Sequence, residues 1–175
     1  MPTSTTNPIA AEEAGTLSSL LSQSANERSG VVAAVAAISA CGDLSGAQEA
    51  LSNAATQRNE LLQQLDDDQF SALPSSSQLI LALSTAWESS ESSDNSYAQW
   101  AQDEMDRYTG IDTYTATSLT TSTTSGCVQD DYADANYQAA QQTDQQANTA
   151  KQTFVSEWNP VATTYGLPTW TPNQV

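Results

Sequence analysis

Apolar residues recur with a helical period in four separate segments of this 175-residue chain, and this repeat restricts the folds open to it. Within each segment they follow one another in steps of three or four residues, which places them along one face of an α-helix. Including the polar residues that interrupt them, the four faces are Leu17, Leu21, Ser24, Arg28, Val31, Val35 and Ile38; Leu44, Ala47, Leu51, Ala54, Arg58, Leu61 and Leu65; Leu79, Leu83, Trp87, Ser90, Asp94, Tyr97, Ala101 and Tyr108; and Tyr137, Ala140, Asp144, Ala147, Lys151, Phe154 and Trp158. Gly42, Pro74 and Gly110 separate the segments, because glycine and proline favour helix ends. The sequence therefore predicts an all-α fold, an antiparallel up-down-up-down four-helix bundle.

A chain of this length has room for one domain with a single core. We expect residues 1–10 to form a disordered N-terminal segment, residues 11–160 to form the bundle, and residues 161–175 to form an aromatic C-terminal tail that packs on it. Pro160 should stop or kink the fourth helix. The Thr/Ser-rich residues 109–131 predict a long loop between the third and fourth helices, with a short hairpin as the alternative.

The chain has two cysteines, Cys41 and Cys127. Cys41 lies where the first helix is expected to end, next to Gly42, which is available for the left-handed position that often closes a helix. Cys127 lies in the predicted connection between the third and fourth helices. In an up-down-up-down bundle these two places are at the same end, so the pattern predicts a disulfide and an oxidising compartment. Two unpaired buried thiols are the alternative.

Two arginines interrupt the apolar faces of the first two helices. Arg28 and Arg58 are equally far from the turn between those helices, so they should lie at one level of the bundle. Counting along the other helices places Glu88 near Arg58 and Asp144 near Arg28. We therefore predict a partly buried layer of arginines and carboxylates that fixes how the helices pair. In the alternative, both arginines extend into solvent along the surface.

Few residues of the chain suit catalysis. It contains no histidine, and its single lysine, Lys151, lies on a helical face where Glu12 or Glu13 could pair with it. Zinc hydrolases, Ser-His-Asp triads and Cys-His nucleophiles are excluded in their usual forms, and a glycine-rich phosphate loop is missing. A carboxylate pair of the glycosidase type is a weak signal in so acidic a chain. We expect the protein not to be an enzyme.

The formal net charge is −17, from 21 acidic and 4 basic residues. A field of this sign repels phosphate groups, so we expect no nucleic-acid partner. Acidic clusters at residues 66–68 and 130–136 offer oxygen ligands for calcium. Neither has the spacing of an EF-hand loop, and carboxylates near helix N-termini are common for capping alone. No cofactor and no metal site are predicted.

The sequence also bears on the location of the protein. No run approaches the roughly 20 apolar residues of a membrane span, so we expect no membrane insertion of this segment. Its first residues lack the features of an export signal, and it has no Asn-x-Ser/Thr site for N-glycosylation. With the cysteine pair, these observations favour a secreted protein or the extracytoplasmic face of a bacterial envelope, with the export signal or anchor outside this sequence.

One ordered set of residues in the second half of the chain resembles a known kind of domain. The set is Trp87, Tyr97-Ala98-Gln99-Trp100-Ala101, Gly126-Cys127, Tyr137-Gln138-Ala139-Ala140, Asp144, Ala150-Lys151, Phe154, Trp158-Asn159-Pro160 and Tyr165-Gly166-Leu167-Pro168. It is similar to that of extracytoplasmic helical-bundle domains in uncharacterised actinobacterial proteins that are membrane-tethered or secreted. The resemblance implies exposure at the cell envelope and implies no ligand. The Thr-rich insertion between Gly110 and Gly126 departs from the pattern.

Together these features favour a non-enzymatic extracellular interaction or sensor domain that binds a protein or a small ligand. Trp100, Trp158 and Trp170 are the candidate ligand-facing residues, although aromatic residues at helical positions commonly pack in a core. The alternative is a structural spacer or stalk that displays another domain, and weak binding of cell-wall glycans is a third candidate. A concave apolar pocket would favour the first function, and an unbroken polar surface the second.

Overall fold

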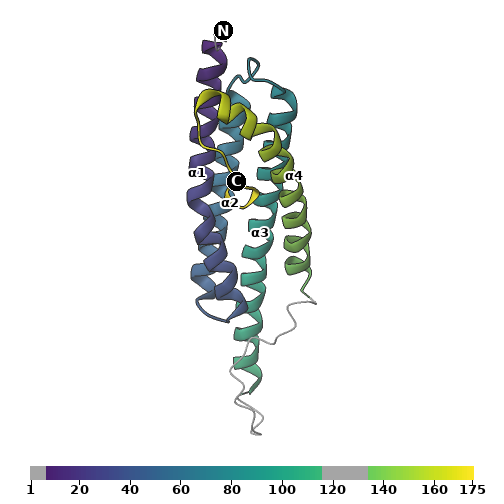
Figure 1. Cartoon of the computed structure of the whole chain (residues 1–175). Coiled ribbons are helices and arrows are strands. Elements are labelled where there is room, and N and C mark those ends of the chain that lie inside the picture. The colour runs from purple at the N-terminus through teal and green to yellow at the C-terminus, as the bar shows by residue number, and fades with distance from the viewer. Residues whose placement is uncertain (1–6, 116–133) are drawn as a thin grey trace.

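The computed structural model describes residues 7–115 and 134–175 of the chain. Four long helices make up most of this part, namely α1 (Pro8–Ser39), α2 (Leu44–Asp67), α3 (Ser76–Thr115) and α4 (Ala135–Tyr165), and a short 3₁₀ helix, η2 (Pro172–Gln174), follows them. The four helices run alternately down and up beside one another, and no strand occurs among the described residues (Figure 1). The predicted all-α four-helix bundle is confirmed.

Side-chain caps set where the helices begin. Asn7 accepts a hydrogen bond from the backbone N–H of Ile9, and Pro8 occupies the first turn, where its missing N–H leaves no helical bond unmade. As a result α1 begins at Pro8, and residues 8–10 are helical, although the sequence placed them in an N-terminal segment. Asp43 and Asp134 cap α2 and α4 in the same way.

The turn after α1 differs from the prediction in one residue. The left-handed conformation is adopted by Cys41, with φ of 52°, and not by Gly42. The N–H groups of Cys41 and Gly42 donate to the carbonyls of Ile38 and Ala37 at 2.9 and 2.8 Å, which closes the helix end. Since a Cβ disfavours this conformation, Cys41 carries a local strain of about 1 kcal/mol.

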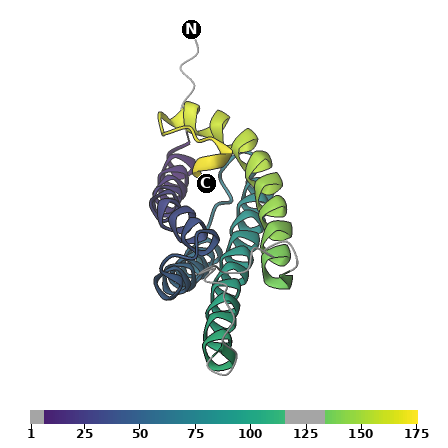
Figure 2. The ribbon, with the colours of Figure 1, turned by 90° about the horizontal axis from the view of Figure 1, so that it is seen from below.

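Both α3 and α4 continue past the residue expected to end them. α3 passes Gly110 and ends at Thr115, and α4 passes Pro160 and ends at Tyr165. Proline has no N–H for the helical ladder and its ring crowds the preceding turn, so a helix that passes through proline bends. The last part of α4 leans across the end of the bundle toward α1 (Figures 1 and 2).

Two apolar clusters fill the bundle, one near each end. The upper cluster, near the start of α1, is built around Trp87, Phe154 and Trp158, and the lower cluster, near the end of α1, is built around Tyr97 and Trp100. α1 packs mainly on α2 and makes few contacts with α3 or α4. The end-on view shows α1 and α4 apart from each other over much of their length (Figure 2).

The C-terminal tail folds back on the upper cluster. Trp158 Nε1 donates to the carbonyl of Pro168 at 3.1 Å, and the side chain of Asn159 exchanges two hydrogen bonds with the backbone of Trp170 at 3.0 and 2.9 Å. Val175, the last residue, is buried against the same cluster. The tail thus covers the end of the bundle toward which α4 bends.

Candidate functional site: a charged pocket in the bundle

A pocket lies between the two apolar clusters, partway along the bundle. All four helices contribute to its wall, and its volume is about 230 Å³. We call it the central pocket. Its lining residues are Arg28, Val31, Val32 and Val35 of α1, Arg58 of α2, Ser90, Asp94 and Tyr97 of α3, and Asp144, Ala147, Asn148 and Lys151 of α4. The pocket combines fixed charges with an apolar wall, as small-molecule sites commonly do.

Three of the four basic residues of the chain, Arg28, Arg58 and Lys151, line the central pocket. The fourth, Arg107, has a half-exposed side chain and pairs with Glu104 and Asp134 on α3 and at the start of α4. In a protein with a formal charge of −17, composition alone predicts acidic pockets. With only four basic residues in the chain, three of them in one pocket is an arrangement that the composition does not predict.

Two neighbours hold Arg58 inside the bundle. Its Nη1 donates to the hydroxyl of Ser24 at 2.9 Å, and its Nε lies 3.5 Å from a carboxylate oxygen of Asp94. Arg58 and Asp94 are both only 4% exposed. Burial raises the pKa of Asp94 to about 6, although the positive charge of Arg58 opposes this shift. Arg58 and Asp94 thus form a buried pair of opposite charges.

Asp144 has hydrogen-bond donors of its own. The hydroxyls of Ser93 and Tyr97 donate to its two carboxylate oxygens at 2.7 and 2.9 Å, and the side chain of Gln141 donates to the Tyr97 hydroxyl at 2.7 Å. Burial, followed by the charge of Asp144, raises the pKa of Tyr97. The phenol therefore stays protonated and keeps its role as a donor. These bonds hold the carboxylate of Asp144 at one side of the pocket.

Lys151 and Arg28 have no comparable partners. Neither side chain makes a hydrogen bond or an ion pair with another described residue, although both line the central pocket. Lys151 is only 5% exposed. Burial, followed by the charges of Arg58 and Arg28, lowers its pKa to about 8. The charges of Asp144 and Asp94 oppose this shift without cancelling it, so burial of the ammonium group remains unfavourable. The pocket therefore holds two cations that no described residue pairs.

The predicted layer of arginines and carboxylates included Arg28, Arg58, Asp144 and Glu88. The first three line the central pocket, whereas Glu88 is exposed and borders a different pocket. Asp94 takes the place assigned to Glu88. Counting from the helix ends placed Glu88 at the height of Arg58, but α3 starts higher along the bundle than α2 ends, because the connection between them rises along the bundle axis. Arg58 lies nine residues before the end of α2, but Asp94 lies eighteen residues after the start of α3.

Lys151 was expected to pair with Glu12 or Glu13, and this expectation was wrong. Glu13 is buried at the upper end of the bundle, where it accepts hydrogen bonds from the backbone N–H groups of Ala72 and Leu73 at 2.9 and 3.2 Å. A signal for the pocket was present in the sequence, because every helical face is interrupted by polar residues near its middle. Those that line the central pocket are Arg28, Arg58, Ser90, Asp94, Asp144 and Lys151.

The tryptophans proposed as ligand-facing residues do not form a shared groove. Trp100 and Trp158 are fully buried, in the lower and upper clusters respectively. The ring of Trp100 lies 6.2 Å from that of Tyr97 and 5.0 Å from that of Tyr137. Trp170 is partly buried against the upper cluster. The core packing that was the alternative for these residues is what the structure shows.

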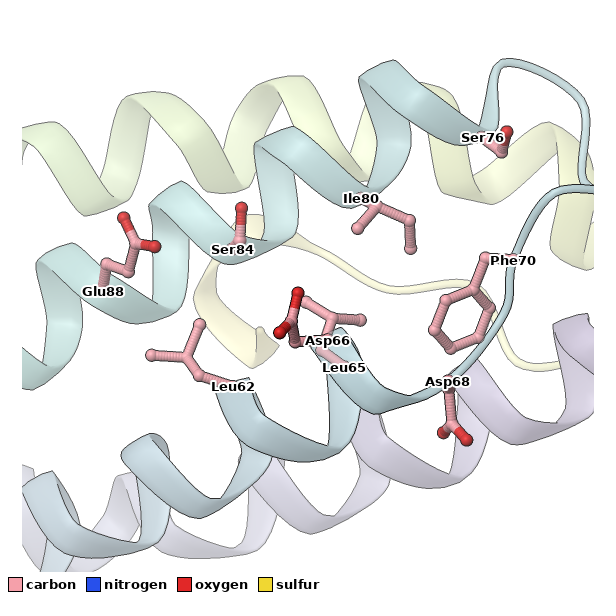
Figure 3. A pocket seen from close by; sticks show the side chains of 9 residues that line it. All are labelled: Leu62, Leu65, Asp66, Asp68, Phe70, Ser76, Ile80, Ser84 and Glu88. Carbon is pink, nitrogen blue, oxygen red and sulfur yellow. The ribbon is translucent and has the colours of Figure 1, made fainter.

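A larger pocket, of about 420 Å³, lies between the end of α2 and the start of α3. Figure 3 shows Asp66 of α2 between the side chains of Leu62 and Phe70, opposite Ile80 of α3, with Glu88 and Asp68 toward opposite ends of the pocket. Its charged residues are all acidic, as expected from the composition. No group of three or more potential metal ligands occurs among the described residues. We place the candidate site in the central pocket because three of the four basic residues of the chain line it.

Several predictions fall on residues that the structure does not describe, among them the loop expected between α3 and α4 and its hairpin alternative, which from residue 116 onward lie outside the described residues. Cys127 lies outside the described residues, so its pairing with Cys41 stays a prediction. The acidic residues 130–133 also lie outside them. Asp134, which belongs to the same acidic cluster, caps α4 by accepting hydrogen bonds from the backbone N–H groups of Asn136 and Tyr137. For this residue the structure shows a capping role.

Comparisons with protein-family models, with curated proteins and with solved structures find no match for this chain. No helix in the described part of the chain is long and apolar enough to cross a membrane. The fold and the central pocket define a helical-bundle domain with a small charged internal site. Its function must be inferred from that site.

Proposed function

We propose that this protein is a non-enzymatic extracellular interaction or sensor domain that binds a small ligand in the central pocket. The observation that carries the proposal is the pair of cations Arg28 and Lys151, which share one pocket without an ion-pair partner among the described residues. A ligand that supplies this partner would offset the unfavourable burial of Lys151. It would bind the folded state alone and so stabilise the fold.

The position of the central pocket suits a sensor. Arg28 belongs to α1 and Lys151 to α4, and these two helices make few direct contacts. A ligand held by both side chains would connect two helices that the fold leaves loosely joined. Such a ligand would favour the more closed arrangement of α1 and α4, because it binds that arrangement better. Binding would thereby be converted into a change in the shape of the bundle.

The groups in the central pocket suit binding better than catalysis. Asp144 accepts a hydrogen bond from Tyr97, and Asp94 forms an ion pair with Arg58. The lowered pKa of Lys151 is typical of reactive amines. However, arginines neighbour it in the pocket, and the chain contains no histidine that could move protons near neutral pH. Complementarity to a bound anion accounts for this set of groups more directly.

The extracellular location rests on the two cysteines and agrees with the resemblance to actinobacterial envelope domains. We expect Cys41 and Cys127 to form a disulfide that ties the connection between α3 and α4 to the turn after α1. A peptide map of the protein purified without reductant should contain two peptides linked through these cysteines. Alkylation of both thiols in the unreduced, secreted protein would remove the basis for this location.

The single lysine of the chain offers a direct test of ligand binding. An amine-reactive ester can label only the N-terminal amine of the full chain and Lys151, which should react more slowly because it is only 5% exposed, and peptide mass spectrometry separates the two. The labelling is repeated with a panel of small acids, amines and alcohols. A ligand of the central pocket should slow the labelling of Lys151 and leave that of the N-terminal amine unchanged. If no compound does so, the protein is a spacer and not a small-ligand binding domain.

A further inference from the structure

The charges around the central pocket limit which ligand it accepts. Three cations, Arg28, Arg58 and Lys151, line it together with two carboxylates, Asp94 and Asp144. Arg58 and Asp94 form an ion pair, and Asp144 is held by hydroxyl groups, so the unpaired positive charge lies on Arg28 and Lys151. A ligand with one negative charge matches this excess. A second negative charge would be repelled by the two carboxylates of the wall.

The two unpaired cations suit a carboxylate. Arg28 reaches the pocket from α1 and Lys151 from α4. A guanidinium group presents a planar fork of N–H donors, and an ammonium group presents three donors. A carboxylate has two oxygens, each of which accepts more than one hydrogen bond, so it can accept from both side chains at once. Such charge-assisted bonds are the stronger kind in proteins.

The wall next to these cations is apolar. Val31, Val32 and Val35 follow Arg28 along α1, and Ala147 of α4 lines the same pocket. Val32 is 58% exposed and is one of three large apolar side chains that are so exposed among the described residues. An aliphatic chain attached to a bound carboxylate would cover these methyl groups and remove them from water. The ligand is therefore expected to have a charged end and an apolar end.

The size of the central pocket sets the length of that apolar end. Its volume of about 230 Å³ is below the range of about 300–1,000 Å³ that drug-sized ligands occupy. Building on the function proposed above, we propose that the central pocket binds a short aliphatic monocarboxylate. Its carboxylate lies between Arg28 and Lys151, and its carbon chain lies against the valines of α1.

Butanoate is the probe that tests this assignment, and isothermal titration calorimetry on the full chain measures its affinity. 1-Butanol lacks the charge, butylamine reverses it, succinate doubles it, and inorganic phosphate replaces the carboxylate with another anion. Butanoate should bind at least about tenfold more tightly than each of these four, because each of them loses a charge-assisted bond, the apolar contact or the charge balance. Butanoate should also slow the labelling of Lys151.

Variants assign the two ends of the ligand. Arg28→Gln removes one donor and should weaken butanoate binding by about tenfold to a hundredfold. Val32→Ser should weaken butanoate more than acetate, since acetate has no chain to cover the valines. Arg107→Gln is the matched control, because it makes the same change at the basic residue outside the pocket and should leave the affinity unchanged. Circular dichroism establishes that each variant is folded.

The failure of this assignment is distinguishable from the failure of the proposed function. If Arg28→Gln binds butanoate as tightly as the original protein, or if phosphate, butanol, butylamine or succinate binds as tightly as butanoate, the monocarboxylate assignment is wrong. Selective protection of Lys151 by one of those compounds would still support a binding function. If no compound protects Lys151, the binding function and the assignment both fail.

Discussion

The upper cluster and the central pocket are built from the same four helices, but they treat buried groups differently. In the upper cluster Trp87 and Trp158 are fully buried and uncharged; the Nε1 of Trp158 donates to the carbonyl of Pro168, whereas the Nε1 of Trp87 has no acceptor among the described residues. In the central pocket Lys151 is nearly as buried, yet no described residue accepts a hydrogen bond from it. Burial of large rings favours folding in the first region, whereas burial of an unpaired ammonium group opposes it in the second. Regions of the second kind are commonly kept for binding.

The largest expected effect is the loss of a ring from the upper cluster. Trp158→Ala removes a fully buried indole that stacks on Phe154, with ring centroids 6.2 Å apart. It should lower the free energy of unfolding by about 3–5 kcal/mol, which urea denaturation measures. Trp170→Ala, at a partly buried residue beside the same cluster, is the control and should have a smaller effect. Equal effects would mean that burial does not set the stability of this region.

The second prediction concerns the buried pair in the central pocket. Arg58→Met leaves Asp94 buried without its cation and should lower the free energy of unfolding by about 3 kcal/mol. The double variant Arg58→Met/Asp94→Leu removes both charges and should recover most of this loss. A double-mutant cycle by urea denaturation measures the coupling. Additive losses would show that the two side chains do not act as a pair.

The third prediction is a pH dependence of stability that arises in the central pocket. Burial raises the pKa of Asp94 from 3.8 to about 6, so between these values the folded state binds more protons than the unfolded state. The contribution of Asp94 to stability should therefore fall by about 2–3 kcal/mol as the pH rises through this window. The charged neighbours are Arg58, Arg28, Lys151 and Asp144.

Subtracting the pH profile of Asp94→Asn from that of the original protein isolates this contribution in urea denaturation at several pH values. The difference should follow the fall described above, because the amide does not titrate. A flat difference between the two profiles would contradict the raised pKa.

The fourth prediction is that replacing Lys151 raises the free energy of unfolding, whereas Trp158→Ala lowers it. Lys151→Met shortens the side chain by one heavy atom and removes a buried charge, so it should raise the free energy of unfolding by about 1–2 kcal/mol near neutral pH. The same variant should lose the binding of butanoate. A loss of stability would mean that Lys151 has a partner within the folded chain, and the contrast with the upper cluster would disappear.

The smallest effect is expected at Glu88. The sequence placed this residue in the layer of arginines and carboxylates, but in the structure it lies outside the central pocket. Glu88→Gln changes an exposed side chain outside the central pocket and should alter the free energy of unfolding by less than about 0.5 kcal/mol. Thermal unfolding of Glu88→Gln beside Asp94→Asn compares the two directly. A large effect of Glu88→Gln alone would restore Glu88 to the charge layer.

The helices were predictable because their signals are local. Steps of three and four residues between apolar positions define a helical face, and Asp43 and Asp134 carry the capping signal within a few residues of the N–H groups they bind. The level of Asp94 was not predictable in this way. It depends on how the connection between α2 and α3 rises along the bundle, and the composition of that connection does not determine its path.

The candidate site was predictable only in part. Arg28, Arg58 and Asp144 stood out as polar residues on apolar faces, but the same pattern in Asp94 and Lys151 did not reveal that they meet at one level. Whether the tryptophans are exposed or buried could not be predicted from the sequence either. Trp100 and Trp158 lie on helical faces that suit either a groove or a core, and only the packing of neighbouring helices distinguishes the two.

The amino-acid sequence by itself determined the number and type of the helices and the strong negative charge, since these depend on composition and on neighbours along the chain. Only the tertiary structure decided that Arg58 forms an ion pair with Asp94, whereas Lys151 and Arg28 have no ion-pair partner among the described residues of the central pocket. The physical reason is that an ion pair forms at distances of a few ångströms. Which charges come that close depends on the relative heights of helices that are distant in the sequence.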